Sequence, residues 1–185
     1  MTGAPTRALR DEALNLLDRR GSILELAREI SRLMRRQGIP GVVVGGIAVV
    51  LHGHLRVTKD VDVFLDQPLQ PIAELLLAEG FTYDEKRREF TREGVPLHLV
   101  TREQVAKPPR EIVEIEGITT VGLADLIEMK LASGMRNMLR AQDLADVIGL
   151  IRHNCLTSEY ARHLDKSLRP TFRKLVKAIQ QEGGC

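Results

Sequence analysis

Two aspartates, Asp60 and Asp62, are the residues of this sequence best suited to metal chemistry. They stand two positions apart in the segment KDVDVFLD, where polar and apolar residues alternate as they do in a strand. Such side chains leave the same face, with alpha carbons about 6 to 7 Å apart at a rise of roughly 3.3 Å per residue. Two close carboxylates repel each other unless a cation lies between them, and Mg²⁺ takes oxygen ligands while keeping positions for phosphate. The pair predicts a Mg²⁺ site for phosphoryl or nucleotidyl transfer; the alternative is a solvated strand face.

Two glycines, Gly45 and Gly46, follow the apolar run at residues 42–44. Because glycine has no side chain, backbone N–H groups and the start of a following helix can approach a phosphate there. The segment contains neither G-x-G-x-x-G nor G-x-x-x-x-G-K-[ST], so Rossmann and P-loop sites are not indicated. Alone, the glycines would be an ordinary tight turn. Next to the two aspartates, they predict a site for a nucleoside triphosphate.

The elements that must position these residues are short strands and amphipathic helices. Apolar spacing predicts two helices at residues 8–17 and 23–33, and the runs at 42–44 and 61–65 predict strands on either side of a short helix at 47–51. The charged stretch 84–89 is expected to be a solvated hairpin or edge. The remaining predicted elements are a helix at 69–79, strands at 81–83 and 89–100 with a turn at Glu93-Gly94, a hairpin at 113–121, and helices at 126–131, 139–151, 159–164 and 172–179.

This order of elements predicts the α+β class, with a small mixed β-sheet, flanking helices, two N-terminal helices and a helical C-terminal region. The expected division is residues 1–38 for the N-terminal helices, 39–121 for the core and 122–185 for the C-terminal helices. Hydrophobic residues make up 43% of the chain and aromatic residues 3%, so the core must be aliphatic.

Charge and cysteine content narrow the functional classes. A net charge of +2 is too small to attract nucleic acid over the whole molecule, although basic clusters could act locally. Two cysteines, Cys155 and Cys185, are too few for a disulfide framework or a zinc site, which favours the cytoplasm. No apolar run of about 18 residues occurs, so neither secretion nor membrane insertion is expected.

The strand, the glycine pair, the segment Arg56-x-Thr58 and then Asp60-x-Asp62 together resemble the polymerase-beta-like nucleotidyltransferase superfamily. Residues 42–66 look most like its small bacterial members, including the AbiEii-type toxins. The resemblance implies that Gly45 and Gly46 hold the phosphates of the nucleotide and that Asp60 and Asp62 bind Mg²⁺.

The resemblance extends downstream to about residue 151. The segments LADLIEMKLASG and RAQDLADVIGLI look like helical segments of the family, which places Lys130, Asp143 and Asp146 near the nucleotide. The ordinary alternatives are a snorkelling Lys130, pairing of both aspartates with Arg140, and an Arg56 that only solvates the approach to the strand.

One position departs from the family's pattern. Family members commonly carry a third carboxylate on a later strand, and His98 stands at that position in GVPLHLV. An imidazole can ligate a metal or accept a proton, but it supplies no negative charge for Mg²⁺. His98 is therefore a candidate catalytic residue and also a reason to expect weakened activity.

The resulting hypothesis is a Mg²⁺-dependent, toxin-like enzyme that moves NMP from an NTP such as ATP to a hydroxyl of RNA, protein or a small molecule. Arg56, Thr58, Lys130 and Asp143 would complete the nucleotide site. A binding module with a degraded site is the alternative. A third hypothesis is a subunit that needs a partner chain or a second copy of itself, because the N-terminal helices have apolar faces.

Overall fold

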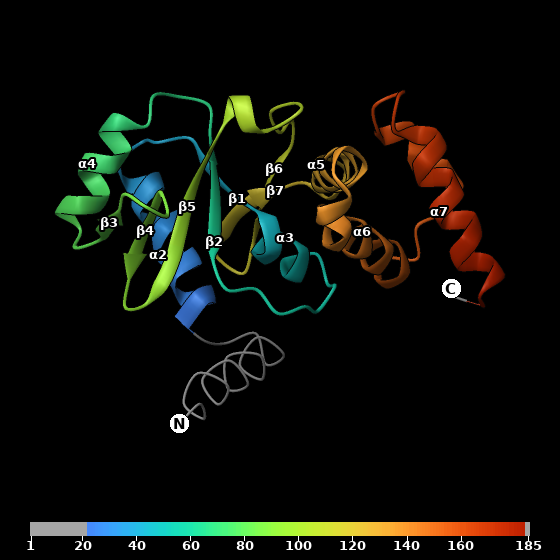
Figure 1. Ribbon diagram of the computed structural model, residues 1–185, viewed down its shortest axis with the longest axis horizontal. Coiled ribbons are helices and arrows are strands. Elements are labelled where there is room, and N and C mark those ends of the chain that lie inside the picture. The colour runs from blue at the N-terminus through green and yellow to red at the C-terminus, as the bar shows by residue number, and fades with distance from the viewer. Residues whose placement is uncertain (1–21, 184–185) are drawn as a thin grey trace.

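The computed structural model describes residues 22–183, and Figure 1 follows the chain through them. The helix predicted at residues 8–17 lies outside this range. The first described helix is α2 (Ser22–Arg36), and α3 (Gly45–Leu51) and α4 (Gln70–Ala78) follow. The C-terminal helices are α5 (Leu123–Arg136), α6 (Ala141–His153) and α7 (Arg169–Gln181), with 3₁₀ turns η1 (Arg102–Gln104), η2 (Met138–Arg140) and η3 (Ser158–His163) between elements.

Seven strands form one mixed sheet in the order β3-β4-β5-β2-β1-β7-β6. The central strands are β2 (Val61–Leu65), paired antiparallel with β1 (Gly41–Val44) and parallel with β5 (Val95–Thr101). Two hairpins extend the sheet at its edges. Their strands are β3 (Thr82–Asp84), β4 (Glu89–Arg92), β6 (Ile112–Ile115) and β7 (Ile118–Val121).

The alternation of residues along β2 assigns its side chains to two different cores. Val61, Val63 and Leu65 pack with α2 and α4 on one face of the sheet. Phe64 belongs to the second core, which α5, α6 and α7 complete. Because alternate residues of a strand share a face, Asp62 lies on the same side as Phe64. The candidate metal ligand thus faces the C-terminal helices.

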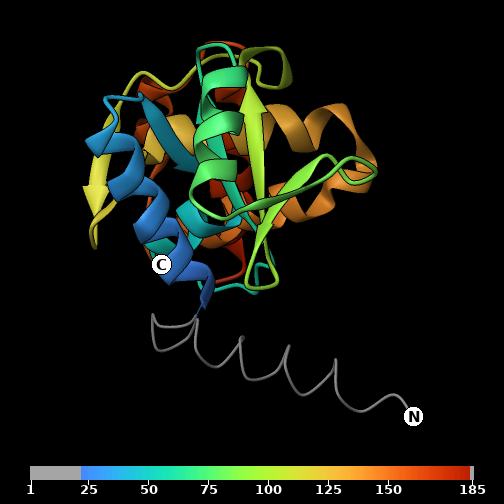
Figure 2. The same ribbon diagram turned by 90° about the vertical axis from the view of Figure 1, so that its left-hand side faces the viewer.

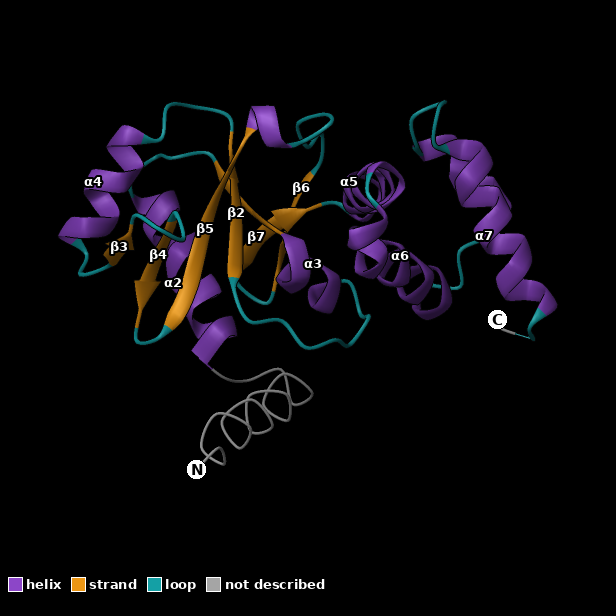
Figure 3. Ribbon diagram, viewed as in Figure 1, coloured by secondary structure: helices purple, strands orange, loops and turns teal. Residues whose placement is uncertain are grey.

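Helices cover both faces of the sheet. Figure 2 shows α2 and α4 across the near face, and Figure 3 shows α5, α6 and α7 beyond the opposite face. Buried residues of α2 recur at helical spacing, as the pattern at 23–33 predicted. None of the helices in residues 22–183 combines the length and apolar character that crossing a membrane requires.

The predicted α+β class with a mixed sheet and flanking helices is confirmed. Two details differ. The helix predicted at 47–51 begins at Gly45, so both glycines belong to its first turn. The segment predicted as a helix at 159–164 is the 3₁₀ turn η3. The division into residues 1–38, 39–121 and 122–185 stays a prediction.

Candidate metal and nucleotide site

Asp60, Asp62 and His98 meet at the centre of the sheet. Asp62 on β2 lies opposite His98 on the parallel strand β5, and Asp60 occupies the bend just before β2. Nδ1 of His98 is 3.3 Å from an oxygen of Asp62 and 3.5 Å from an oxygen of Asp60. One ligand atom from each residue falls within 4.8 Å of the others. Two carboxylates and one imidazole converge closely enough to share a single divalent cation, so these donors fit a divalent metal ion.

The electrostatics of this group favour positive charge. Burial and the neighbouring Asp62 raise the pKa of the Asp60 carboxyl above its ordinary value. The hydrogen bond to Asp62, together with that to Glu89, raises the pKa of His98 to about 9, although burial opposes this shift. The imidazole is therefore protonated at neutral pH and balances part of the carboxylate charge. A bound cation would replace that proton as the source of positive charge.

Glu89 is the site residue that the sequence analysis missed. It lies in the stretch 84–89, which was expected to be solvated, but Glu89 is only 9% exposed and that expectation is wrong for it. One of its carboxylate oxygens is 3.0 Å from Nε2 of His98. The turn at Glu93-Gly94 could have identified Glu89, because this turn sets the pairing of the strands on either side of it. In the β4–β5 register Phe90 faces Leu97, and extending this register by one residue on each strand brings Glu89 opposite His98.

The two glycines allow the chain to pass close to polar side chains. Gly45 has a φ of +67°, and a Cβ there would lie 2.0 Å from a carboxylate oxygen of Asp62. A Cβ on Gly46 would lie 2.4 Å from Oγ1 of Thr58. Gly45 thus makes room for Asp62, and Gly46 makes room for Thr58. Their contact with nucleotide phosphates stays a prediction.

Replacing Gly45 with alanine should disrupt the metal site more than it disrupts the fold. The positive φ alone costs about 1 to 2 kcal/mol, and the new Cβ must push the Asp62 carboxylate aside. We expect a loss of metal-dependent nucleotide affinity of about 10-fold or more, by analogy with damage to other metal-site neighbours. The measurement is calorimetric titration of the nucleotide with a divalent metal.

Gly117→Ala is the matched control. Gly117 also has a positive φ, +79°, but a Cβ there would meet nothing within 4 Å. Urea unfolding should show a similar backbone penalty in both variants, with affinity lost only in Gly45→Ala. Equal nucleotide affinity in the two variants would contradict the proposed role in the metal site of Asp62, the carboxylate beside Gly45.

A buried ion network lies on the helical side of the site. Nζ of Lys130 is 2.7 Å from Asp143 and 2.8 Å from Asp146, and the Lys130 side chain is only 11% exposed. Burial would raise the pKa of the Asp143 carboxyl, but hydrogen bonds from Lys130 and Ser133 hold it below its ordinary value. The snorkelling interpretation of Lys130 is therefore wrong. Arg140 approaches Asp143 at 3.6 Å, whereas the ion-pair partners of Asp146 in the described part of the chain are Lys130 and Arg56.

Arg56 and Thr58 connect the loop before β2 to these groups. Nη1 of Arg56 donates to Asp146 at 2.8 Å, which ties the loop to α6. Oγ1 of Thr58 is 3.3 Å from Oδ1 of Asp60. Both residues therefore support charged groups of the site, and the interpretation of Arg56 as a purely solvating residue is wrong.

A cleft of about 640 Å³ lies between the sheet and the helices. Five of the sequence-predicted residues line it: Gly45 from the first turn of α3, Asp62 from β2, His98 from β5, Lys130 from α5 and Asp143 from α6. Gly46, Arg56, Thr58 and Asp60 are not part of its lining. Four arginines add positive charge to its wall: Arg87, Arg88, Arg136 and Arg140. Arginine is well suited to phosphate because its guanidinium offers a fork of donors.

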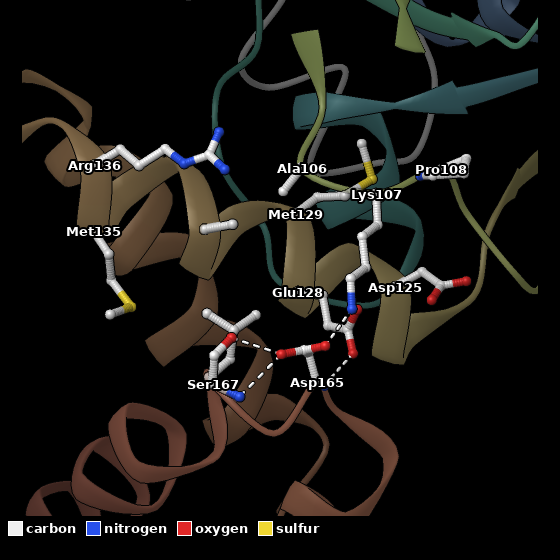
Figure 4. A pocket seen from close by; sticks show the side chains of 12 residues that line it. Ala106, Lys107, Pro108, Asp125, Glu128, Met129, Met135, Arg136, Asp165 and Ser167 are labelled. Atoms are coloured by element: carbon white, nitrogen blue, oxygen red, sulfur yellow. Dashed lines mark hydrogen bonds and ion pairs between the residues drawn. The ribbon is translucent and has the colours of Figure 1, made fainter. Parts of the chain in front are cut away.

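A second hollow, of about 360 Å³, adjoins the cleft and shares four residues with it: Ala106, Met129, Ala132 and Arg136. Figure 4 shows Lys107 and Ser167 directed at the carboxylate of Asp165. Glu128 accepts the backbone N–H of Asp165 and pairs with Arg110. The carboxylates here are engaged in holding α5 to the connection before α7, which indicates a structural role. Metal chemistry is better placed at Asp60 and Asp62.

Solved structures with the same fold are nucleotidyltransferases. The chain resembles an antigenic nucleotidyltransferase-like protein from Paracoccidioides brasiliensis at 16% identity and a TM-score of 0.53, over 86% of this chain and 88% of that one. It also resembles ANT(2″)-Ia, solved in complex with adenylyl-2″-tobramycin, at 14% identity and a TM-score of 0.56, over 81% and 96% of the two chains. These similarities establish the fold.

A third structure, a putative nucleotidyltransferase from H. pylori, matches at 19% identity and a TM-score of 0.52, over 82% of this chain and 74% of that chain. No curated protein matches the sequence. A family model described as "Nucleotidyltransferase of unknown function (DUF6036)" matches residues 21–164, which span both the sheet and the helices that line the cleft. The chain therefore belongs to this family of nucleotidyltransferases.

Proposed function

We propose that the protein transfers a nucleoside monophosphate from an NTP to an acceptor hydroxyl in the cleft between the sheet and helices α5 and α6. The observation that carries the proposal is the convergence of Asp62 and His98 from the sheet with Lys130 and Asp143 from the helices on one cleft. Asp60 completes the group of metal-binding donors. Family membership supports transferase chemistry.

Some residues of the chain would position the nucleotide, and others would balance its negative charge. Gly45 lines the cleft beside Asp62, where the phosphates would lie, and the arginines of the cleft wall would bind phosphate oxygens. Asp60 and Asp62 would hold the divalent cation, Mg²⁺ in the sequence-based hypothesis. A cation held by these residues would neutralise phosphate charge and make the acceptor hydroxyl more acidic. The fixed donors supply catalysis because they do not have to reorganise during the reaction.

The reaction balances as a single displacement. The acceptor oxygen forms a bond to the α-phosphorus, and the bond from that phosphorus to the oxygen bridging to the β-phosphate breaks. Pyrophosphate leaves with the electron pair of that bond. The hydroxyl proton passes to a neighbouring base, and the carboxylate of Asp62, which lines the cleft, is the proposed acceptor.

The acceptor belongs to the proposal as a class of hydroxyl compound: RNA, protein or a small molecule. A toxin role is part of the proposal only through the resemblance of residues 42–66 to AbiEii-type proteins. His98 favours one second candidate, a binding module of the same fold that holds nucleotide without transferring it, because the imidazole removes one negative charge from the metal site.

The test is a transfer assay with each of four NTPs labelled at the α-phosphate. The protein is incubated with the NTP, Mg²⁺ or Mn²⁺, and total RNA, a protein extract or a set of small polyhydroxy compounds. The proposal predicts labelled acceptor and an equal amount of released pyrophosphate. Nucleotide binding without pyrophosphate release from any of the four NTPs would instead establish the binding module.

A further inference from the structure

The imidazole of His98 lies between two sets of carboxylates. Its Nδ1 edge faces Asp62 at 3.3 Å and Asp60 at 3.5 Å, and its Nε2 faces Glu89 at 3.0 Å. Because the two ring nitrogens are distinct, Glu89 and the aspartates contact different atoms of the ring. Glu89 thus stands behind His98 as seen from Asp60 and Asp62, in the place where metal-binding histidines commonly have a carboxylate partner.

We propose that Glu89 is a positioning residue that holds His98 as an Nδ1 ligand of the metal, and that the completed site binds Mn²⁺ in preference to Mg²⁺. The inference rests on the metal site of the proposed function. It assigns a role to a residue outside the Asp60 and Asp62 motif, and it names the class of ion that the altered ligand set favours.

The hydrogen bond to Glu89 decides which ring nitrogen is free. In a neutral imidazole, one nitrogen carries a hydrogen and the other carries a lone pair. If a cation takes the place of the Nδ1 proton, donation from Nε2 to the Glu89 carboxylate keeps the remaining hydrogen on Nε2. The lone pair is then on Nδ1, the nitrogen that faces Asp60 and Asp62. A carboxylate in this position fixes the orientation of the ring and increases the basicity of the ligating nitrogen.

Glu89 is held firmly enough to perform this task. Its side chain is only 11% exposed, and its second carboxylate oxygen is 3.4 Å from Nη1 of Arg87. The two oxygens therefore have different partners, one on each side. A buried carboxylate requires such partners to offset the loss of water. Burial and the contact to His98 hold the Glu89 carboxylate behind the imidazole, and Arg87, whose side chain is 73% exposed, adds little.

The ligand chemistry then favours a different ion. Mg²⁺ prefers an octahedral shell of oxygen atoms. The set Asp60, Asp62 and His98 offers two carboxylates and one nitrogen instead. Imidazole suits first-row transition ions, and Mn²⁺ also accepts carboxylate oxygens. A nitrogen ligand from His98, where Mg²⁺ would prefer a third oxygen, should therefore weaken Mg²⁺ binding more than Mn²⁺ binding.

The first measurement is Mn²⁺ binding to the full chain without nucleotide, with Mg²⁺ as competitor. Electron paramagnetic resonance of the free Mn²⁺ ion reports how much has bound. We expect Mn²⁺ to bind about 10-fold or more tightly than Mg²⁺. Electron spin echo modulation of the bound ion should show coupling to ¹⁴N from His98. His98→Asp should lose this ¹⁴N signal and reduce the preference for Mn²⁺, while it keeps a metal site.

Glu89→Gln tests the positioning role. It should weaken Mn²⁺ binding by about 10- to 100-fold and reduce or remove the ¹⁴N coupling, as expected when a partner of a metal-binding histidine is lost. Glu85→Gln is the matched control, because Glu85 is an exposed carboxylate in the turn that precedes β4, the strand of Glu89. Unfolding in the presence of a chelator measures the stability of the metal-free variant. A variant that is only less stable would bind less Mn²⁺, but each bound ion would keep its ¹⁴N coupling.

Bound Mn²⁺ without ¹⁴N coupling in the native protein, or unchanged affinity and coupling in Glu89→Gln, would overturn the inference. These outcomes can be distinguished from a failure of the proposed transferase function. A ¹⁴N signal without transfer activity would support the inference and contradict the transferase proposal. Transfer activity without the ¹⁴N signal would do the reverse.

Discussion

Replacement of Asp62 with asparagine is expected to lower pyrophosphate release by about 100- to 1000-fold, a loss comparable to that of a key electrostatic group in other active sites. Asp62 faces the cleft from β2, and its oxygens approach both His98 and the space that a Cβ on Gly45 would occupy. An amide keeps the size of the side chain but removes the negative charge that a divalent cation needs. The measurement is the initial rate of pyrophosphate release at saturating NTP and metal.

Asp66→Asn is the control for this variant. Asp66 directly follows β2, and its carboxylate is 45% exposed and paired with Arg102. It should retain nearly full activity, because an exposed ion pair contributes little. If Asp62→Asn were as active as Asp66→Asn, the metal site would have to lie elsewhere in the cleft.

The second large effect concerns stability. Lys130→Met should lower the free energy of unfolding by about 3 to 5 kcal/mol, because it removes the cation shared by two buried carboxylates. For a chain of this size, this loss corresponds to a fall in melting temperature of about 6 to 20 °C. Methionine has nearly the length of lysine, so lost packing contributes little. Urea and thermal unfolding measure the effect.

A double variant separates the uncompensated charge from other causes. Lys130→Met with Asp143→Leu removes both members of one ion pair and leaves the Arg56–Asp146 pair intact. Much of the lost stability should return, because replacing a whole buried pair with apolar groups is often neutral. The control Lys177→Met changes an exposed lysine of α7 and should alter stability by less than about 0.5 kcal/mol. A double variant less stable than Lys130→Met would contradict this account of the network.

The order of elements could be predicted because local patterns dictate it. Alternation at 61–65 identified β2 and placed Asp62 on one face of the sheet, and Gly45 with Gly46 marked the turn beside it. The pairing of Asp62 with His98 also agrees with the position assigned to the missing carboxylate. The strand and the glycine turn depend on residues close together in the chain, whereas the position of His98 followed from the resemblance to the superfamily.

The buried charges could not be predicted in the same way. Lys130, Asp143 and Asp146 have the spacing of an exposed, salt-bridged helix pair, and only the packing of α5 against α6 buries them. Glu89 sits in a run of charged residues, so its composition suggested solvent, whereas the β4–β5 register carries it to His98. Burial of a charged side chain depends on contacts made by distant segments, which hydrophobic periodicity does not report.

Thermal unfolding with each of the four NTPs, in the presence and absence of Mg²⁺ or Mn²⁺, tests the central claim most directly. At a nucleotide concentration about 100 times its dissociation constant, binding should add about 2.7 kcal/mol, a rise in melting temperature of about 5 to 10 °C. The account predicts that this rise requires the metal, disappears in the Asp60→Asn, Asp62→Asn double variant and persists in Asp66→Asn. No rise with any nucleotide, or a rise of equal size in the double variant, would contradict a metal and nucleotide site at Asp60 and Asp62.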